Sequence, residues 1–318
     1  MSDPARLKLV FMGTPAMAVP ALNALAGAGH DLVLAVTQPD RPAGRGRKLR
    51  RGEVAAAADA LGLTVAQPAR AREITGLLAA IAPDALAVMA FGQLLPPELL
   101  AIPRLGAVNV HTSLLPALRG AAPIQRAVLN GLTETGVTTM LMDAGLDTGA
   151  ILLQRATPIG DQETAGGLGQ RLAMLGAELL VQTLAGLAEG SVKPTPQDHA
   201  RATIAPRLSK DEGLIDWARP ARELDWLVRG ADPWPGAYTF LAGQPLRLFA
   251  PTLVIPGPVG AEPGTILAPP PGGDWLLVAC GDGALGVGQA QAAGKRRLAA
   301  GDFQRGARLT PGLRLGAA

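Results

Sequence analysis

The sequence predicts an α/β fold for its first part, with an open, mostly parallel sheet of Rossmann type, followed by a small OB-like β-barrel. Three observations support this prediction. Short apolar runs alternate with longer helical patterns up to residue 189, a stretch rich in proline and polar residues follows, and apolar runs split by glycine and proline fill the remainder. The length of 318 residues suits about two domains, and 48% hydrophobic with 17% charged residues indicates a globular chain.

The first strands and helices are visible as apolar runs closed by glycine. Residues 7–12 form a strand candidate that ends at Gly13, and the alanine- and leucine-rich residues 18–28 form a helix that Gly29 can end. The alternation continues along the chain, which favours a parallel sheet. The next expected elements are a strand over 32–37, a helix over 52–61, a short strand over 64–66 and a helix over 74–81.

Two nearly continuous apolar runs mark the centre of the expected sheet. Residues 84–90 and 106–111 carry few polar side chains, which is typical of strands buried on both faces of a parallel sheet. Strands over 135–142 and 151–158 and an amphipathic helix over 164–187 complete this domain.

A stretch without periodicity separates the two expected domains. Residues 190–207 are rich in proline and polar groups, so we interpret them as a linker between domains 1–189 and 208–318. After a helical segment at about 221–228, short strand candidates follow at a spacing that suggests a small barrel. These strands are expected over 237–241, 245–249, 264–267, 275–279 and 283–287.

Composition excludes several kinds of site. Cys280 is the single cysteine, which excludes an intramolecular disulfide and a thiolate zinc site and favours a reducing compartment. The three histidines stand far apart, so we expect no metal. We find neither an apolar run of the roughly 18 residues that a membrane span needs nor a signal peptide. We therefore expect a cytoplasmic protein that does not bind membranes, and a monomer by default.

Positive charge is concentrated in two segments. Residues 41–51 contain six basic and no acidic side chains, and residues 290–318 contain six basic side chains against Asp302 alone, whereas the whole chain carries only +3. Such segments suit a polyanion, because each neutralised phosphate releases counterions. A solvated basic loop and tail would explain either segment alone. Together they favour a nucleic-acid partner.

Candidate chemistry lies just after the strands, because an open α/β sheet binds ligands beyond the carboxyl ends of its strands. The turn at 13–15 is too short for a dinucleotide fingerprint, which disfavours a nicotinamide enzyme. Asn109 and His111 are two residues apart on a strand and share one face, whereas Val110 packs opposite them. The alternative is a structurally satisfied histidine beside a capping asparagine.

A second polar cluster lies on the loop between two later strands. Asp143 and Asp147, within MDAGLDTGAIL, are both candidate partners for His111. For either aspartate the alternative is turn chemistry beside a nearby glycine. The spacing does not choose between them.

The two polar clusters, Asn109 with His111 and Asp143 with Asp147, lie in one segment that resembles a known family. The segment NVHTSLLPALRGAAPIQRAVLNGLTETGVTTMLMDAGLDTGAIL resembles the formyltetrahydrofolate-dependent formyltransferases. The PDRPAGRG loop and the added C-terminal domain are similar to the tRNA-acting branch of that family. Further similar stretches, in order across both domains, are FMGTPAMAVPAL, TQPDRPAGRGRKL, LSKDEGLIDW, DPWPGAY and AGKRRL.

The resemblance implies roles for individual residues. Asn109, His111 and Asp147 match the catalytic trio of the family, which favours Asp147 over Asp143. The family's folate-holding loop corresponds to Ser113, Leu114, Leu115 and Pro116. The arginine-rich insertion matches a loop that enters the acceptor end of initiator tRNA, with Arg45 at its key position. The expected tRNA contacts are Arg41, Arg45, Arg47, Lys48, Lys295, Arg296 and Arg297.

The resemblance also implies an activity: transfer of the formyl group of 10-formyltetrahydrofolate to the free amino group of methionyl initiator tRNA. In such a reaction an α-amino group titrating near ~7.7 to 8.0 needs only a modest base. Asn109 and a protonated His111 would stabilise the oxyanion, and Asp147 would either keep His111 charged or accept the proton of the amine.

Other functions remain as alternatives. Another folate-dependent formyltransferase or a formyltetrahydrofolate hydrolase would keep the same trio, and a non-catalytic RNA-binding protein or a nucleotide-dependent oxidoreductase belongs to a different class. The sequence departs from the usual family pattern at Thr112, Ala117, Leu118 and Phe91, which puts details of the pocket wall and one phosphate contact in doubt.

Overall fold

The computed structural model describes residues 6–43 and 48–316, which form two compact units. The first unit takes the chain up to residue 121, residues 135–157 and 169–205. The second unit takes 122–134, 158–168 and the chain from 206 onward. The units are therefore not consecutive in sequence, unlike the predicted domains 1–189 and 208–318.

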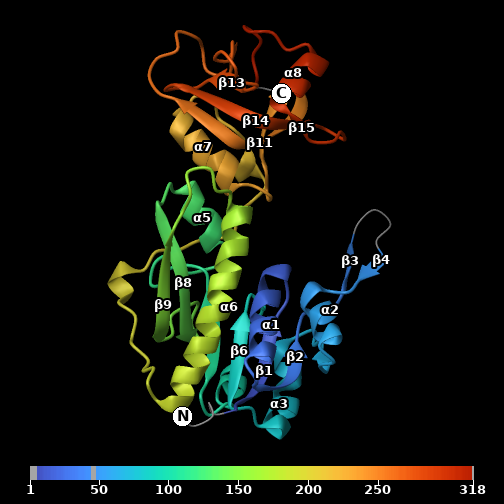
Figure 1. Ribbon diagram of the computed structural model, residues 1–318, viewed down its shortest axis with the longest axis vertical. Coiled ribbons are helices and arrows are strands. Elements are labelled where there is room, and N and C mark those ends of the chain that lie inside the picture. The colour runs from blue at the N-terminus through green and yellow to red at the C-terminus, as the bar shows by residue number, and fades with distance from the viewer. Residues whose placement is uncertain (1–5, 44–47, 317–318) are drawn as a thin grey trace. The chain divides into compact units, whose positions relative to one another are not determined.

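The first unit is built on a seven-stranded sheet of order β5-β2-β1-β6-β7-β8-β9 (Figure 1). The pairs among the first five strands are parallel, and β8 runs antiparallel to β7. This confirms the predicted Rossmann-like, mostly parallel sheet. The strands are β1 Lys8–Gly13, β2 Asp31–Val36, β5 Val65–Ala66, β6 Ala85–Met89, β7 Ala107–His111, β8 Glu134–Leu141 and β9 Ile151–Pro158.

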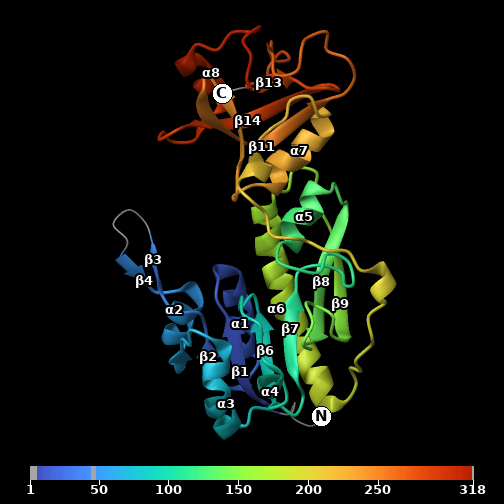
Figure 2. The same cartoon turned by 180° about the vertical axis from the view of Figure 1, so that it is seen from behind.

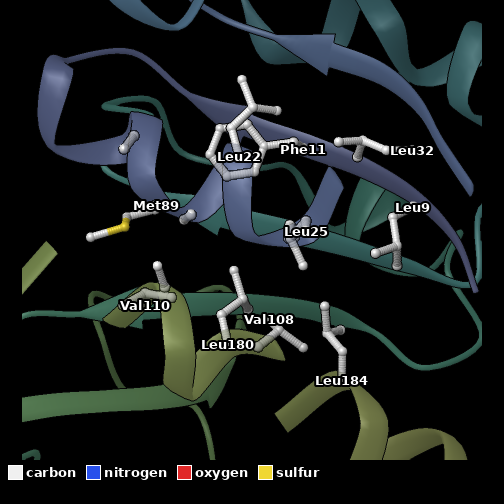
Figure 3. Close-up of a cluster of buried hydrophobic side chains, with 14 of the residues drawn as sticks. Leu9, Phe11, Leu22, Leu25, Leu32, Met89, Val108, Val110, Leu180 and Leu184 are labelled. Carbon is white, nitrogen blue, oxygen red and sulfur yellow. The ribbon is translucent and has the colours of Figure 1, made fainter. Parts of the chain in front are cut away.

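Helices cover both faces of this sheet, because alternate residues of the central strands point to opposite sides. On one side Leu9 of β1 and Val108 of β7 pack with Leu22 of α1 and Leu180 of α6 (Figure 3). On the other side Val10 of β1 packs with residues of α3 and α4. The strands are thus buried on both faces, which explains their continuous apolar runs. The helices are α1 Val19–Gly27, α2 Glu53–Ala60, α3 Thr75–Ile81, α4 Pro97–Leu100 and α6 Ala165–Glu189, with 3₁₀ turns η1 Ala16–Ala18, η2 Ala71–Ile74 and η3 His199–Arg201.

The long helix α6 is apolar enough to span a membrane by length and composition, with a mean hydropathy of 1.3 over its apolar window. Half of that window is buried inside the structure, and Leu180 and Leu184 belong to the core of the first unit. The helix approaches β7 closely, since a Cβ at Gly176 would lie 2.7 Å from Val110 Cγ1. The packing is that of a core helix.

Two elements of the first unit were not expected. The basic segment forms a hairpin, in which β3 (Arg41–Ala43) pairs antiparallel with β4 (Lys48–Arg50). The four-residue helix α4 is too short to produce a periodic pattern. The expected linker has no regular element beyond η3, yet Gln197 and Ala205 within it are buried. Most of its other residues are exposed, so these two positions are where its side chains are buried.

The second unit is an antiparallel half-barrel, which agrees with the expected OB-like fold (Figure 2). Its strand order is β10-β11-β14-β13-β12, and β15 pairs with β14. Leu129 of α5 packs against its core, which explains why segment 122–134 belongs to this unit. The elements are α5 Pro123–Leu129, η4 Asp211–Gly213, α7 Ala221–Gly230, β10 Ala237–Leu241, β11 Gln244–Ile255, β12 Ile266–Leu267, β13 Leu276–Ala279, β14 Ala284–Ala292, β15 Leu298–Ala299 and α8 Ala300–Ala307.

Candidate active site

The site is centred on His111, the last residue of β7. The imidazole is only 6% exposed. Its Nε2 lies 3.0 Å from the carbonyl oxygen of Leu118, and since a carbonyl only accepts, Nε2 carries the hydrogen. Its Nδ1 lies 3.7 Å from Oδ2 of Asp147. One ring nitrogen is thus fixed by the backbone, and the other faces a carboxylate.

Asp147 reaches His111 from the loop between β8 and β9. Its backbone is left-handed, with φ of 53°, a conformation that aspartate tolerates better than most residues. Its Oδ2 accepts a hydrogen bond of 2.8 Å from the backbone N–H of Gly120. Asp143 instead accepts from the Gly145 N–H and the Thr148 hydroxyl within its own turn. The structure therefore brings Asp147, rather than Asp143, beside His111.

Asn109 lies two residues before His111 on the same strand, between Val88 of β6 and Met140 of β8. Its side chain is half-buried. Within residues 6–43 and 48–316 its carboxamide has no hydrogen-bond partner. A polar group left unpaired in a partly buried position is free to bind a ligand.

The loop from Ser113 to Pro116 is held firmly against β8 and β9. The Ser113 hydroxyl donates to the carbonyl oxygen of Ala117 at 2.6 Å. Thr138 of β8 donates to the Ser113 carbonyl oxygen at 2.7 Å and accepts from the Leu115 N–H. Gln154 of β9 donates to the Leu115 carbonyl oxygen at 2.8 Å. Leu114 and Pro116 remain half-buried in a loop whose backbone is fixed.

Most of the residues that depart from the usual family pattern are buried. Thr112 and Leu118 are buried, and Leu118 has a left-handed backbone with φ of 59°. Phe91 is 2% exposed and packs in the core. Its carbonyl oxygen accepts hydrogen bonds from Thr14 and Gln38, which tie together the loops after β6, β1 and β2.

Two contacts of the site were missed by the sequence analysis. Gly120 supplies the N–H that binds Asp147, and Gln197 of the expected linker donates to the carbonyl oxygens of Asp147 and Gly149. The linker segment has no periodicity, and its polar composition suits a solvated loop equally well. The sequence contains no signal for the burial of Gln197.

Two of the predicted tRNA contacts of the first basic segment, Arg41 and Lys48, lie on the paired strands β3 and β4. Arg41 is exposed and donates to Gln38 Oε1 at 2.6 Å. Lys48 begins β4, and its backbone pairs with Ala43, whereas Arg45 and Arg47 lie outside the described residues.

A neighbouring arginine is bound within the protein. Arg51 donates two hydrogen bonds of 2.8 Å to Asp59. These bonds hold the pKa of the Asp59 carboxyl below its usual value. Arg51 is thus less free to contact a ligand than Arg41.

The second predicted group, Lys295, Arg296 and Arg297, is exposed between β14 and β15. The Arg297 guanidinium lies 3.8 Å from the centroid of the Phe249 ring and 3.7 Å from Asp232 Oδ2. The side chains of Lys295 and Arg296 have no ion pair with any described residue. The structure thus leaves two of these three cations available at the surface.

A cavity of about 470 Å³ lies elsewhere, in the second unit, between loops 258–263 and 280–283. None of the predicted site residues lines it. Cys280 is among the residues that line it, and burial raises the pKa of this thiol to about 12, which keeps it protonated and unreactive at neutral pH.

Comparison with known proteins gives the same family over both units. A family model described as formyl transferase matches residues 7–184, and one described as formyl transferase, C-terminal domain, matches residues 207–308. The methionyl-tRNA formyltransferase of Solibacter usitatus is 49% identical over 98% of this chain and 99% of its own. The methionyl-tRNA formyltransferase of Pelobacter propionicus is 51% identical over 98% of this chain and 96% of its own.

A solved structure supports the fold. HypX from Aquifex aeolicus in complex with tetrahydrofolic acid aligns with a TM-score of 0.66 and 15% identity, over 94% of this chain and 47% of that chain. At this identity the likeness concerns the fold alone. The sequence matches, by contrast, are close and extend over nearly the full length: the chain belongs to the formyl transferase family, where it groups with the methionyl-tRNA formyltransferases.

Proposed function

We propose that this chain transfers the formyl group of 10-formyltetrahydrofolate to the α-amino group of methionine esterified to initiator tRNA. The observation that carries the proposal is the convergence of His111 and Asp147, 3.7 Å apart, with Asn109 two residues before His111 on β7 and its carboxamide without a partner among the described residues. It occurs in a chain about half identical to methionyl-tRNA formyltransferases along its whole length.

The residues present fit a folate donor. Asn109 offers a carboxamide with no partner in the described part of the chain, and Leu114 and Pro116 offer half-buried apolar side chains on a loop fixed by Thr138 and Gln154. When bound, the donor supplies an electrophilic formyl carbon. The proposed holding residues are Ser113, Leu114, Leu115 and Pro116.

The hydrogen bond of His111 to the Leu118 carbonyl oxygen fixes which ring nitrogen carries the hydrogen. The Leu118 carbonyl fixes the hydrogen on Nε2, so Nδ1 is the nitrogen that gains or loses a proton. When protonated, Nδ1 can donate to an oxygen that develops negative charge, and the Asn109 carboxamide can donate from the same strand face. Removal of one such donor typically lowers the rate about 100- to 1000-fold.

Asp147 completes the proposed trio. Its carboxylate, held by the Gly120 N–H, lies 3.7 Å from Nδ1 and faces that nitrogen. It also provides a base near the amine, whose pKa of about 8 makes proton loss easy at neutral pH. None of these residues is an activated nucleophile, so the proposed transfer is direct: a bond forms between the amine and the formyl carbon, and the bond from that carbon to the donor nitrogen breaks. The amine loses one proton and the departing nitrogen gains one, so the protons balance.

The basic segments are proposed to bind the tRNA. Arg41, Lys295 and Arg296 are exposed, and arginine and lysine side chains bind phosphate. The proposed contacts of Arg45, Arg47 and Lys48 rest on the resemblance of their loop to that of the tRNA-acting relatives. Arg297 is proposed as a weaker contact, because Phe249 and Asp232 already hold it. We place this activity in the cytoplasm, where translation begins, and propose a monomer.

The decisive experiment incubates the purified chain with 10-formyltetrahydrofolate and methionyl initiator tRNA, and measures formyl-methionine after ester hydrolysis. Formyl-methionine should form with the wild-type chain and fall about 100-fold or more with Asp147→Asn. Formylation of a small amine or free hydrolysis of the donor, without any product on the tRNA, would instead identify another folate enzyme.

A further inference from the structure

One side chain of the expected linker, Gln197, forms hydrogen bonds with the loop that carries Asp147. Gln197 is only 6% exposed. Its Nε2 donates to the carbonyl oxygens of Asp147 at 2.9 Å and Gly149 at 2.7 Å. Its Oε1 accepts from Arg119 Nε at 3.1 Å and Nη2 at 2.6 Å. The carboxamide of Gln197 thus joins two segments, the one with Arg119 and Gly120 and the loop with Asp147 and Gly149. These segments meet where the Gly120 N–H binds the Asp147 carboxylate.

These two segments are the ones that fix the position of that carboxylate. Arg119 directly precedes Gly120, whose N–H donates to Asp147 Oδ2. Asp147 itself has a left-handed backbone, with φ of 53°, which residues with a Cβ adopt only rarely. The conformation persists where surrounding bonds hold it. Gln197 supplies such a bond to the Asp147 backbone.

Gln197 is in turn anchored on both sides. Two residues earlier, the N–H and carbonyl of Thr195 pair with those of Ile151 at 2.8 Å each. Further along, the Arg119 N–H donates to the Thr203 carbonyl oxygen at 2.8 Å. The segment around Gln197 is therefore fixed to the edge of the sheet before it reaches the loop.

We propose that Gln197 is a positioning residue for formyl transfer: it holds the Asp147 carboxylate beside His111 Nδ1. Its hydrogen bonds go to Arg119 and to the backbone of the Asp147 loop, so it acts through that backbone. The inference rests on the proposed function of Asp147. It assigns the expected linker a part in catalysis rather than the role of a spacer.

The test compares two substitutions. Gln197→Met keeps the length of the side chain and removes every hydrogen bond, and Gln197→Glu keeps the acceptor for Arg119 while removing the donor to Asp147 and Gly149. Both should lower kcat about 10- to 100-fold, the order of loss that follows a misplacement of about 1 Å. The KM for 10-formyltetrahydrofolate should stay within about threefold, since the Ser113–Pro116 loop is fixed by other residues.

Gln162→Met is the matched control. The Gln162 carboxamide likewise joins two backbone groups, since it donates to the Thr252 carbonyl oxygen and accepts from the Thr252 N–H, but in the second unit. Its kcat should equal that of the wild type. Wild-type kcat in both Gln197 variants would overturn the proposal, and so would full activity in Gln197→Glu alone, because that variant lacks the donor to the Asp147 carbonyl oxygen.

A second readout does not depend on the reaction. Hydrogen exchange at the Gly120 amide reports its bond to Asp147 Oδ2, and exchange should be faster in both Gln197 variants than in the wild type and in Gln162→Met. Unchanged exchange would refute the positioning role even with reduced activity. If the wild-type chain formylates no tRNA, the proposed function fails, whereas the Gly120 result still decides whether Gln197 holds the loop.

Discussion

At His111, a single backbone carbonyl decides which ring nitrogen is available. Leu118, in its left-handed conformation, directs its carbonyl oxygen to Nε2, and its N–H is held by the Thr203 hydroxyl at 2.8 Å. Nδ1 is thereby left to face Asp147. Leu118 departs from the usual family pattern, but it orients His111 through its backbone carbonyl. This contact does not involve the Leu118 side chain.

Substitution of Asn109 should lower activity without lowering the stability of the fold. The Asn109 carboxamide has no partner among the described residues, so Asn109→Ala breaks no hydrogen bond of the fold. We expect the unfolding free energy to change by less than about 0.5 kcal/mol, whereas kcat falls about 100- to 1000-fold through loss of an oxyanion donor. Urea denaturation and single-turnover formylation would measure the two effects. A variant that is both unstable and inactive would contradict this assignment.

At the scale of elements, the contact between α6 and β7 depends on one glycine. A Cβ at Gly176 would lie 2.7 Å from Val110 Cγ1, next to the strand that carries His111. Gly176→Val should therefore destabilise the chain by about 1 to 3 kcal/mol through overpacking. Gly167→Ala, on the same helix with its nearest neighbour at 3.6 Å, should cause no loss. Thermal unfolding of the two variants compares them, and equal melting temperatures would refute the close contact.

The second unit holds segment 122–134 partly through a charge pair that responds to pH. The Arg126 Nη1 donates to Glu212 at 2.6 Å, and this bond, with that from the Ser209 N–H, lowers the pKa of the Glu212 carboxyl. A lowered pKa means that the ionised form stabilises the fold at neutral pH. That contribution is complete above the ordinary value of 4.5 and is lost as pH falls through the lowered value.

Glu212→Gln should therefore reduce the loss of stability between neutral pH and acid. Because Glu212 is partly exposed, the difference should be below about 1 kcal/mol. Denaturation of wild type and variant at pH 7 and near pH 3 measures it. A variant whose stability falls with acid as steeply as that of the wild type would show that the pair contributes nothing.

The strands and long helices could be predicted because burial leaves a periodic record in the sequence. Residues 84–90 and 106–111 carry few polar side chains, and they form β6 and β7 within a residue or two of the expected bounds. Packing of the linker leaves no such record, since Gln197 is buried through four hydrogen bonds rather than through a periodic apolar face. The assignment of 122–134 to the second unit depends likewise on tertiary contacts of Leu129.

Across the whole molecule, the chain has a net charge of only +3, with its positive charge concentrated in the β3–β4 hairpin region and near the C-terminus. A cation already held by another side chain is less available to a phosphate than one that is not. In the C-terminal group, Lys295 and Arg296 lack ion pairs within the described chain, whereas Arg297 stacks on Phe249. These neighbours in sequence should therefore differ in their effect on tRNA binding.

The double variant Lys295→Ala, Arg296→Ala should weaken binding of methionyl-tRNA and lower the slope of log affinity against log salt by about one per lost phosphate contact. Arg297→Ala should change that slope little and instead cost about 0.5 to 1 kcal/mol of stability, because its cation–π contact is lost. The KM for 10-formyltetrahydrofolate should stay unchanged in both. Filter binding across a salt series measures the slope for each protein. An equal slope in the wild type, the double variant and Arg297→Ala would mean that residues 295–297 do not contact the tRNA.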